Sequence, residues 1–481
     1  MVFLLVLWFN VIEMNLNELL ADQPPVNHIP DARRTIRQQL LNSGKRMVVI
    51  DDDPTGPQAI YDVRVFMDWS VDTLRKAFRT GDPVFFICTN SRSLSPAEAV
   101  KVSLDAGQNL HEAAEQERAE VLLTSRSDST LRGHFPAELN ALISGLGNKP
   151  DGIILVPAFF EGGRYTAGDI HYAEQDGEMV PVHLTEFARD PAYNYQNSDL
   201  KKWVEEKTDG SVKAEDVRSI SLEMLRVDGP KAVGRELMQA SRTTAFIANA
   251  ACYEDLEVLA MGITEAEGKG KRFAYRCSAS FIKARGGFDD KPLLTYTELS
   301  PENAPGLVIA GSFVDKTSRQ LERLLISGIA EGVELHVEEL RQEDAAKQEI
   351  KTVTDYVNQL LTEGKTAAIY TSRAIQKDPE QDFSETGSRI MQSICRIVSN
   401  VDLKPGWVIA KGGITSIELA KSALDAREAF AIGQILPGVP VWRLLEYARW
   451  VDIPYVVFPG NVGDDESILR AVRVLNGLSN D

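Results

Sequence analysis

Residues 47–56 read MVVIDDDPTG, and this stretch decides the fold. The apolar residues 47–50 predict a buried parallel strand, because such strands are covered on both faces. The strand ends in Asp51, Asp52 and Asp53, followed by a Pro-Thr-Gly turn. Ligands bind beyond the carboxyl ends of strands in open α/β sheets, so three carboxylates that repel one another here indicate a site. Taken alone, they leave open a proton acceptor, a metal site, a hydroxyl-binding site, or solvated turn and capping residues.

The same pattern of apolar run, polar strand end and helix recurs along the chain. Further strands with polar ends are predicted at VFFICTNSRSL (84–94), VLLTSRSDSTLRG (121–133) and GIILVPAFFEGGR (152–164). A helix is predicted to begin after Ser95 and to run to about residue 117, since Ser-Pro-Ala-Glu combines an N-cap, a proline at N1 and a capping-box glutamate. This alternation predicts a parallel, doubly wound α/β sheet.

The length of 481 residues is too great for one core, which indicates more than one domain. We predict two α/β domains, each with a mostly parallel sheet flanked by helices and with the active site in the cleft between them. A stretch rich in proline and polar residues separates them. The irregular residues 165–197 are predicted to form a loop or hairpin that serves as a lid or a dimer contact. The predicted divisions are an extension at 1–30, domains at 31–290 and 307–481, and a linker at 291–306.

The net charge of −18 argues against a non-specific nucleic-acid or anionic-membrane binder and leaves small molecules as the expected partners. The four cysteines are widely scattered without zinc-type spacing, which favours reduced thiols and a cytoplasmic location. The apolar start VFLLVLWF is too short to span a membrane and lacks a basic flank. It is predicted to be a docked helix or to lie upstream of a true start at Met14.

The loop SRSDSTLRG, at residues 125–133, is the first candidate for an anion site. Two guanidinium groups beside hydroxyls at a strand end suit a carboxylate or phosphate, which arginine binds through paired hydrogen bonds. The alternative is local ion pairing of the arginines with Asp128 and Glu138, and His134 is expected to be a surface or capping residue. The candidate residues in this loop are Arg126, Asp128, Ser129, Thr130 and Arg132.

Three glycine-rich strand ends in the C-terminal part indicate a nucleotide site, because backbone N–H groups and helix N-termini bind phosphate. Lys411, Gly412 and Gly413 are predicted to form a turn, with Thr415 or Ser416 capping the next helix. The other two ends contain Gly311 with Ser312, and Gly460 with Asn461 and Gly463. Neither a Walker A motif nor a GxGxxG fingerprint is present, and Gly364-Lys365-Thr366 is interpreted as a helix C-cap.

Seven motifs in order give the chain its resemblance to a known family. From about Val48 onward it resembles the four-carbon acid sugar kinases, which include the 3-oxo-tetronate, D-threonate and D-erythronate kinases. Residues that depart from the family's usual pattern, such as Pro54, Arg126 and Ile414, indicate a divergent branch. The motifs are DDDPTG (51–56), SDSTLRG (127–133), PAFFEGGR (157–164), AGS (310–312), KGGITS (411–416), ILPGVPVW (435–442) and PGNVGDD (459–465).

The resemblance implies a kinase whose N-terminal domain binds the sugar acid and whose C-terminal domain binds ATP with nucleotide-associated Mg²⁺. Asp52, or failing that Asp53, would activate the accepting hydroxyl, and the protein would supply no metal site of its own. Substrate contacts would come from Asp53, Thr55, Gly56, Arg126, Asp128, Ser129, Arg132 and Arg164. Nucleotide contacts would come from Ser312, Gly412, Gly413, Ile414, Thr415, Gly460, Asn461 and Gly463.

Two other functions stay open beside the kinase. The departures at Pro54 and Ile414 suit a nucleotide- or acid-binding regulatory protein that has lost phosphoryl transfer. The triple aspartate suits a metal-dependent lyase or hydrolase that ignores ATP. A homodimer is compatible with each of the three functions.

Overall fold

The computed structural model describes residues 14–147, 149–241, 244–311, 315–372, 383–460 and 462–479. The apolar start and two predicted nucleotide contacts, Ser312 and Asn461, lie outside these ranges. Within the described ranges, no helix is both long enough and apolar enough to cross a membrane.

The N-terminal half is built on an all-parallel sheet, as the sequence predicts. Its strand order is β2-β3-β1-β4-β11-β5-β10-β9. The strands are β1 (Arg46–Asp51), β2 (Val63–Phe66), β3 (Val84–Cys88), β4 (Val121–Arg126), β5 (Gly152–Val156), β9 (Arg218–Ile220), β10 (Thr244–Ala248) and β11 (Phe273–Cys277). The helices packed around them are α2 (Ala32–Ser43), α3 (Val71–Arg79), α4 (Pro96–Glu117), α5 (Ala137–Leu146), α6 (Leu200–Lys207), α7 (Gly229–Leu237), α8 (Tyr253–Gly268) and α9 (Ala279–Gly286).

The C-terminal half has a second parallel block, which ends in an antiparallel hairpin. Its order is β13-β14-β12-β15-β18-β17-β16. The strands are β12 (Leu307–Ala310), β13 (Ala330–Leu335), β14 (Thr366–Thr371), β15 (Val408–Lys411), β16 (Glu428–Leu436), β17 (Val439–Leu444) and β18 (Pro454–Phe458). The helices are α11 (Asp315–Ile326), α12 (Glu343–Thr362), α13 (Phe383–Ser399), α14 (Gly413–Glu418) and α15 (Ser467–Leu475).

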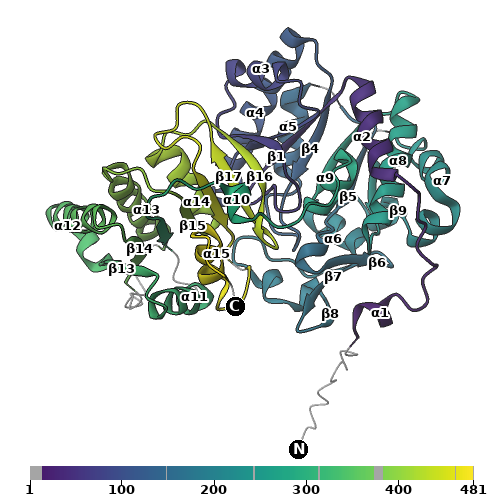
Figure 1. The fold of residues 1–481 in the computed structure, drawn as a ribbon. Helices are drawn as coiled ribbons and strands as arrows, with labels where there is room; N and C mark the ends of the chain where they lie inside the picture. Colours follow the sequence, from purple (N-terminus) through teal and green to yellow (C-terminus); the bar gives the residue numbers. More distant parts are fainter. Residues whose placement is uncertain are drawn as a thin grey trace, which may run out of the picture.

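Strand β16 joins the two halves, because it pairs antiparallel with β2 and makes one 15-stranded sheet (Figure 1). The ends of β2 and β16 are also held by Glu428, which accepts hydrogen bonds from Arg64 and, at 2.8 Å, from Nζ of Lys76 on α3. The sequence predicted one mostly parallel sheet in each half but did not predict that β2 and β16 would join them into a single sheet.

The junction explains how two distant strand ends reach one place. Three antiparallel pairings separate β15 from β1, so the two parallel blocks run in opposite directions. Strands in a sheet rotate by roughly 20° per step, and the six steps from β15 to β1 therefore sum to roughly 120°. This twist turns the carboxyl ends of both blocks toward a common side.

Within residues 165–197, which the sequence predicts to be a loop or hairpin, the structure has most of a small second sheet that spans residues 164–181. Strands β6 (Arg164–Ala167), β7 (Ile170–Gln175) and β8 (Glu178–Pro181) are antiparallel, and a 3-10 turn follows at Glu186–Arg189. Buried His171 attaches this sheet to the loop after β4, because its Nε2 lies 2.7 Å from the carbonyl oxygen of Ser129. The hairpin alternative of the sequence prediction is therefore confirmed.

The remaining short elements lie at the edges of the two halves. Helix α1 (Leu16–Leu19) precedes the first domain, and α10 (Tyr296–Leu299) lies within the predicted linker, capped by Thr295. The helix predicted to start after Ser95 is confirmed as α4, with both bonds of the capping box present. Gly364 has a φ of 75° just after α12, as the C-cap interpretation requires.

Candidate active site

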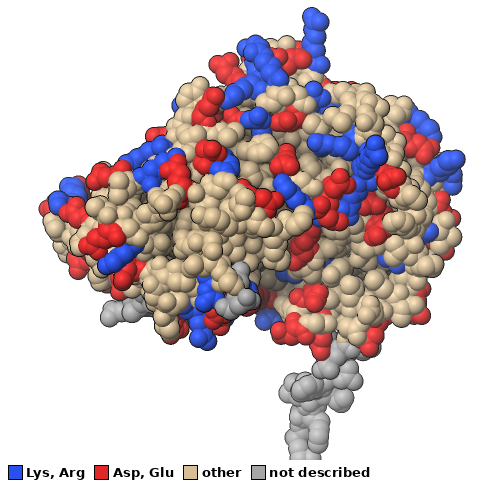
Figure 2. All heavy atoms as spheres, viewed as in Figure 1, with Lys and Arg blue, Asp and Glu red and all other residues tan. Residues whose placement is uncertain are grey.

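A cavity of about 1340 Å³ lies between the carboxyl ends of the two strand blocks, and both halves line it. Ten of the predicted contacts are on its wall: Asp53, Thr55, Arg126, Asp128, Ser129, Arg132, Arg164, Gly413, Gly460 and Gly463. Asp52, Gly56, Gly412, Ile414 and Thr415 are not among its lining residues. Acidic and basic side chains are interspersed over the visible face of the protein, so the overall surface charge does not single out this cavity (Figure 2).

The three aspartates at the carboxyl end of β1, of which Asp51 is the last strand residue, have different surroundings. Asp51 is 1% exposed and pairs with Arg126, whose Nη1 lies 3.1 Å from Oδ1. Burial raises the pKa of Asp51 to about 7, although the Arg126 charge opposes this shift. Gly56 leaves room for the pair, because a Cβ there would lie 1.4 Å from Oδ2 of Asp51. Gly56 therefore has a packing role, and Arg126 already has a carboxylate partner.

Asp52, predicted as the catalytic base, is 4% exposed and turned away from the cavity into a hydrogen-bond network. Its carboxylate accepts bonds from Nη2 and Nε of Arg92, the Nε bond measuring 3.3 Å, and from the hydroxyl of Ser127. The sequence placed Arg92 at a polar strand end but did not include it in the site. Arg92 holds Asp52 in place beneath the cavity floor.

Asp53 is the aspartate that faces the cavity, with 22% of its side chain exposed. It accepts hydrogen bonds from Nη1 of Arg92 at 3.2 Å and from the backbone N–H of Thr55 at 2.8 Å. Burial acts to raise the pKa of Asp53, but Arg92, Arg126 and the Thr55 bonds lower it overall. A Cβ added to Gly413 would lie 3.1 Å from Oδ2 of Asp53, so this carboxylate reaches the C-terminal half.

Two arginines and a phenylalanine form another wall of the cavity. The guanidinium carbons of Arg132 and Arg164 lie 5.2 and 5.5 Å from the ring centroid of Phe187. Arg132 is paired with Asp128, its Nε lying 2.7 Å from Oδ2, as the ion-pairing alternative predicted. The Asp128 carboxyl is buried, which opposes ionisation, but Arg92 and Arg132 lower its pKa overall.

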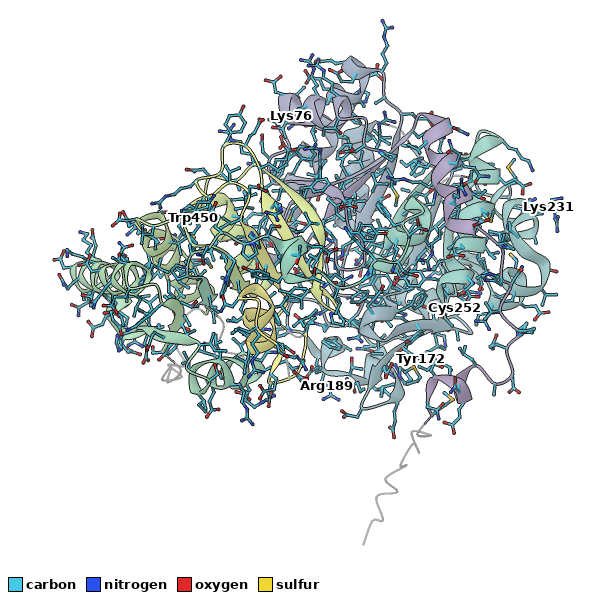
Figure 3. All side chains as sticks on the ribbon, in the orientation of Figure 1. Lys76, Tyr172, Arg189, Lys231, Cys252 and Trp450 are labelled. Carbon is cyan, nitrogen blue, oxygen red and sulfur yellow. The ribbon has the colours of Figure 1, made fainter. Side chains whose placement is uncertain are left out.

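Arg164 differs from Arg132 because it bonds only to backbone carbonyls among the described contacts. Its Nη1 donates to the carbonyls of Gly162 and Gly163, and its buried Nε has no hydrogen-bond partner. No carboxylate lies within 4.0 Å of it in the described part of the chain, and burial lowers its pKa. Figure 3 shows Arg189, two residues beyond Phe187, in the region between the two halves.

The glycine turn after β15 differs in detail from its prediction. Lys411 belongs to the strand rather than to the turn, and α14 begins at Gly413 with Gly412 as its N-cap. Thr415 and Ser416 lie inside the helix, so the prediction that one of them caps it was wrong. Gly412 has φ 108°, a conformation that glycine adopts without strain, and no side chain caps the helix there. Ile414 is 53% exposed.

The loop after β18 is fixed against α11. Gln320 donates from Nε2 to the carbonyl oxygens of Val462, at 3.2 Å, and Asp464, at 2.8 Å. Gly463 has φ 83°, and a Cβ there would lie 2.3 Å from Oγ of Ser467. Glycine at this position therefore lets the backbone pass close to the start of α15.

Several lining residues carried no local signal in the sequence: Phe187, Lys316 and Arg470. Phe187 lies in the stretch that looked irregular, and Lys316 and Arg470 lie on ordinary amphipathic helices. Among the described residues, no group of three or more His, Cys, Asp or Glu side chains could hold a metal ion.

Comparison with family models covers most of the chain. A model described as a sugar-binding N-terminal domain matches residues 47–285, and one described as a nucleotide-binding C-terminal domain matches residues 307–468. The chain is 26% identical over 292 residues to D-erythronate kinase of Heliobacterium modesticaldum, a match that spans 57% of this chain and 59% of that protein. It is 25% identical over 466 residues to D-threonate kinase of Salmonella typhimurium, spanning 90% of this chain and 99% of that one.

Solved structures agree with the fold. A Salmonella typhimurium LT2 protein provisionally named a tRNA synthase superposes with a TM-score of 0.65 at 16% identity, covering 89% of this chain and 98% of its own. A Haemophilus influenzae protein of the DUF1537 family gives 0.59 at 19% identity, covering 89% of this chain and 100% of its own. At these identities the likeness concerns the fold alone.

Proposed function

This chain belongs to the four-carbon acid sugar kinase family, and we propose that it transfers the γ-phosphoryl group of ATP to a hydroxyl group of a four-carbon sugar acid. The observation that carries the proposal is the approach of Asp53 to Gly413 across the shared cavity. A carboxylate from one half thus meets a helix start from the other half. Transfer between two substrates requires such a meeting point.

In this proposal, residues 31–290 hold the acid and residues 307–481 hold the nucleotide, with 291–306 as the connection. Backbone N–H groups of Gly412 and Gly413, and of Gly460 and Gly463, are proposed to bind the phosphates, as helix starts and glycine turns do elsewhere. Lys316 and Arg470 add positive charge on the same wall. Ser312, Asn461, the homodimer and the cytoplasmic location stay predictions from the sequence.

The carboxylate of the acid is proposed to bind Arg132 and Arg164 above the ring of Phe187. Arg164 is the principal candidate, because Arg126 already donates hydrogen bonds to Asp51 and Gln58, and Arg132 already donates one to Asp128. Arg164 has a buried Nε without a partner and no carboxylate within ion-pair distance among the described residues. An incoming carboxylate would compensate for that deficit, since arginine binds carboxylates through paired, charge-assisted hydrogen bonds.

Asp53 is proposed to orient the accepting hydroxyl and to accept its proton, which gives it the role that the sequence assigned first to Asp52. Its lowered pKa keeps it ionised at neutral pH, so it accepts a hydrogen bond readily. Phosphoryl transfer needs little covalent help from the protein, and alignment supplies most of the acceleration. Asp52 would act indirectly, by holding Arg92 against Asp53.

Mg²⁺ would enter with the nucleotide and neutralise charge on its phosphates. Asp53 is the carboxylate of the aspartate cluster that can reach it, because Asp51 and Asp52 are engaged with Arg126 and Arg92. Backbone groups of the two glycine loops would hold the phosphates, and this leaves Asp53 in contact with both the acid and the nucleotide.

An ADP-release screen against four-carbon hydroxy and keto acids, with ATP and Mg²⁺, tests the proposal. We expect turnover with at least one acid and little ADP release without any acid. ADP release that is absent across the panel, from folded protein that binds ADP, would contradict the kinase and favour the regulatory alternative. Metal-dependent conversion of an acid without ATP would instead favour the lyase or hydrolase.

A further inference from the structure

Lys411 is a buried lysine that does not line the cavity itself but bonds to Pro459 and Gly460, which do. It ends β15 immediately before Gly412, and the residue is 0% exposed. Its Nζ donates to the carbonyl oxygens of Pro459, at 2.7 Å, and Gly460, at 3.3 Å. The side chain therefore ties the glycine turn after β15 to the glycine loop after β18.

Among the described residues around Lys411, none carries a negative charge that pairs with it. Nζ lies 4.2 Å from the ring centroid of Phe458 on β18, which offers only a weak attraction. No carboxylate lies within 4.0 Å in the described part of the chain, and the charged group that acts on Lys411 is Lys316 of α11, which repels it. Burial, aided by Lys316, lowers the pKa of Lys411 to about 7.

A buried amine whose acceptors are two carbonyls is poorly stabilised as a cation, because carbonyl dipoles replace only part of its lost hydration. The loops it connects are the ones proposed to hold the nucleotide phosphates. Phosphates in those loops would bring several negative charges close to Nζ. Opposite charge at short range favours the protonated form of an amine.

We propose that Lys411 is a positioning residue that holds the two phosphate loops together, and that nucleotide binding drives protonation of its amine. The inference rests on the nucleotide site of the proposed function. The proton comes from the solvent and joins the Nζ lone pair, and no other bond forms or breaks. Nucleotide affinity and proton uptake are then linked through one side chain.

Calorimetric titration with MgADP at pH 8, in buffers of different ionisation enthalpy, measures this uptake directly. At pH 8 the ADP phosphates, with a highest pKa of about 6, are already ionised and contribute little. For the unmodified protein we expect an uptake of about half a proton or more, since the amine is mostly neutral before binding and charged after it.

Two variants separate positioning from protonation. In Lys411→Met both loop bonds and the titrating amine are lost, so we expect no uptake and an affinity for ADP weaker by about tenfold, the equivalent of one good hydrogen bond. Lys411→Arg stays charged throughout, so it should bind ADP without uptake. Lys421→Met is the matched control: Lys421 lies by Trp69, outside the cavity wall, and its loss should leave the uptake unchanged.

The outcomes distinguish the inference from the function on which it rests. Tight ADP binding by the unmodified protein without proton uptake would overturn the role of Lys411 and leave the kinase proposal intact. Uptake that persists in Lys411→Arg would also overturn it, because another group would then be the proton acceptor. Failure of the unmodified protein to bind ADP would overturn the nucleotide site itself.

Discussion

Exchanging Asp53 for asparagine separates the two aspartates that compete for the catalytic role. The amide keeps an oxygen that can accept the hydrogen bonds from Thr55. The ion pairs of Arg92 with Asp52 and of Arg126 with Asp51 also remain. Folding should therefore change little, by about 1 kcal/mol, as for a partly exposed ion pair. Loss of a positioned proton acceptor lowers turnover by roughly 10²- to 10⁴-fold.

Asp52→Asn is the comparison variant, for which we expect a larger loss of folding stability and a smaller loss of turnover than for Asp53→Asn. Asp52 is 4% exposed and holds Arg92 and Ser127, so its exchange breaks a buried pair and should cost roughly 3 kcal/mol of folding stability. Its turnover should fall less than that of Asp53→Asn when measured on the folded fraction.

The assay is ADP release at saturating ATP and acid, with ADP affinity from calorimetry and stability from urea unfolding. For Asp53→Asn we expect lost turnover with ADP affinity retained. If Asp53→Asn keeps its turnover within about threefold of the unmodified protein, Asp53 is not the proton acceptor, because that loss is smaller than any general-base contribution. A stable Asp52→Asn protein without turnover would return the catalytic role to Asp52.

Three further expectations follow from single contacts. Gly56→Ala should lower the free energy of urea unfolding by roughly 3–5 kcal/mol, because a Cβ 1.4 Å from Oδ2 of Asp51 would break the buried pair of Asp51 with Arg126. Gly268→Ala is the control, since a Cβ there meets no atom within 4 Å and should leave stability almost unchanged. Arg164→Met should raise KM for the acid by roughly 10- to 100-fold and spare KM for ATP, whereas exposed Arg189→Met should change neither. Burial, followed by the charge of Asp52, raises the pKa of Glu138 to about 7. The folded protein therefore retains a proton that the unfolded chain loses above about pH 4.3. The free energy of unfolding consequently falls as the pH rises from about 4.3 to about 7. Glu138→Gln should remove that decline. Relative to the unmodified protein, its free energy of urea unfolding should be higher at pH 8 than at pH 5 by on the order of 2 kcal/mol. An equal difference between the two proteins at both pH values would contradict the assignment to Glu138.

Local patterns predicted much of the N-terminal half. The apolar run before the aspartates formed β1, and the capping box at Ser95 set the start of α4, because each depends on neighbours within a few residues. The pairing of β2 with β16 was beyond such reasoning. It joins residues more than 360 positions apart in the chain, and nothing local specifies which edge strand a hairpin will meet.

The sequence indicated which loops line the cavity better than it indicated what each side chain in them contacts. The triple aspartate was recognised, but the choice between Asp52 and Asp53 depends on where Arg92 and Gly413 arrive from other strands. Gly56 was grouped with the substrate contacts because it belongs to the family motif DDDPTG, but the group that approaches it is Asp51. Phe187 had no signal, since its role arises only when the second sheet folds beside Arg132 and Arg164.

The proposed reaction is phosphoryl transfer to an alcohol group of a four-carbon acid in the shared cavity. Phosphorus NMR of the product, after reaction of ATP with the acid that gives the fastest ADP release, tests it most directly. We expect a phosphate monoester resonance that is absent when Asp53→Asn replaces the unmodified protein. An acyl phosphate, trapped by hydroxylamine as a hydroxamate, or ADP and inorganic phosphate with no phosphorylated acid, would contradict it.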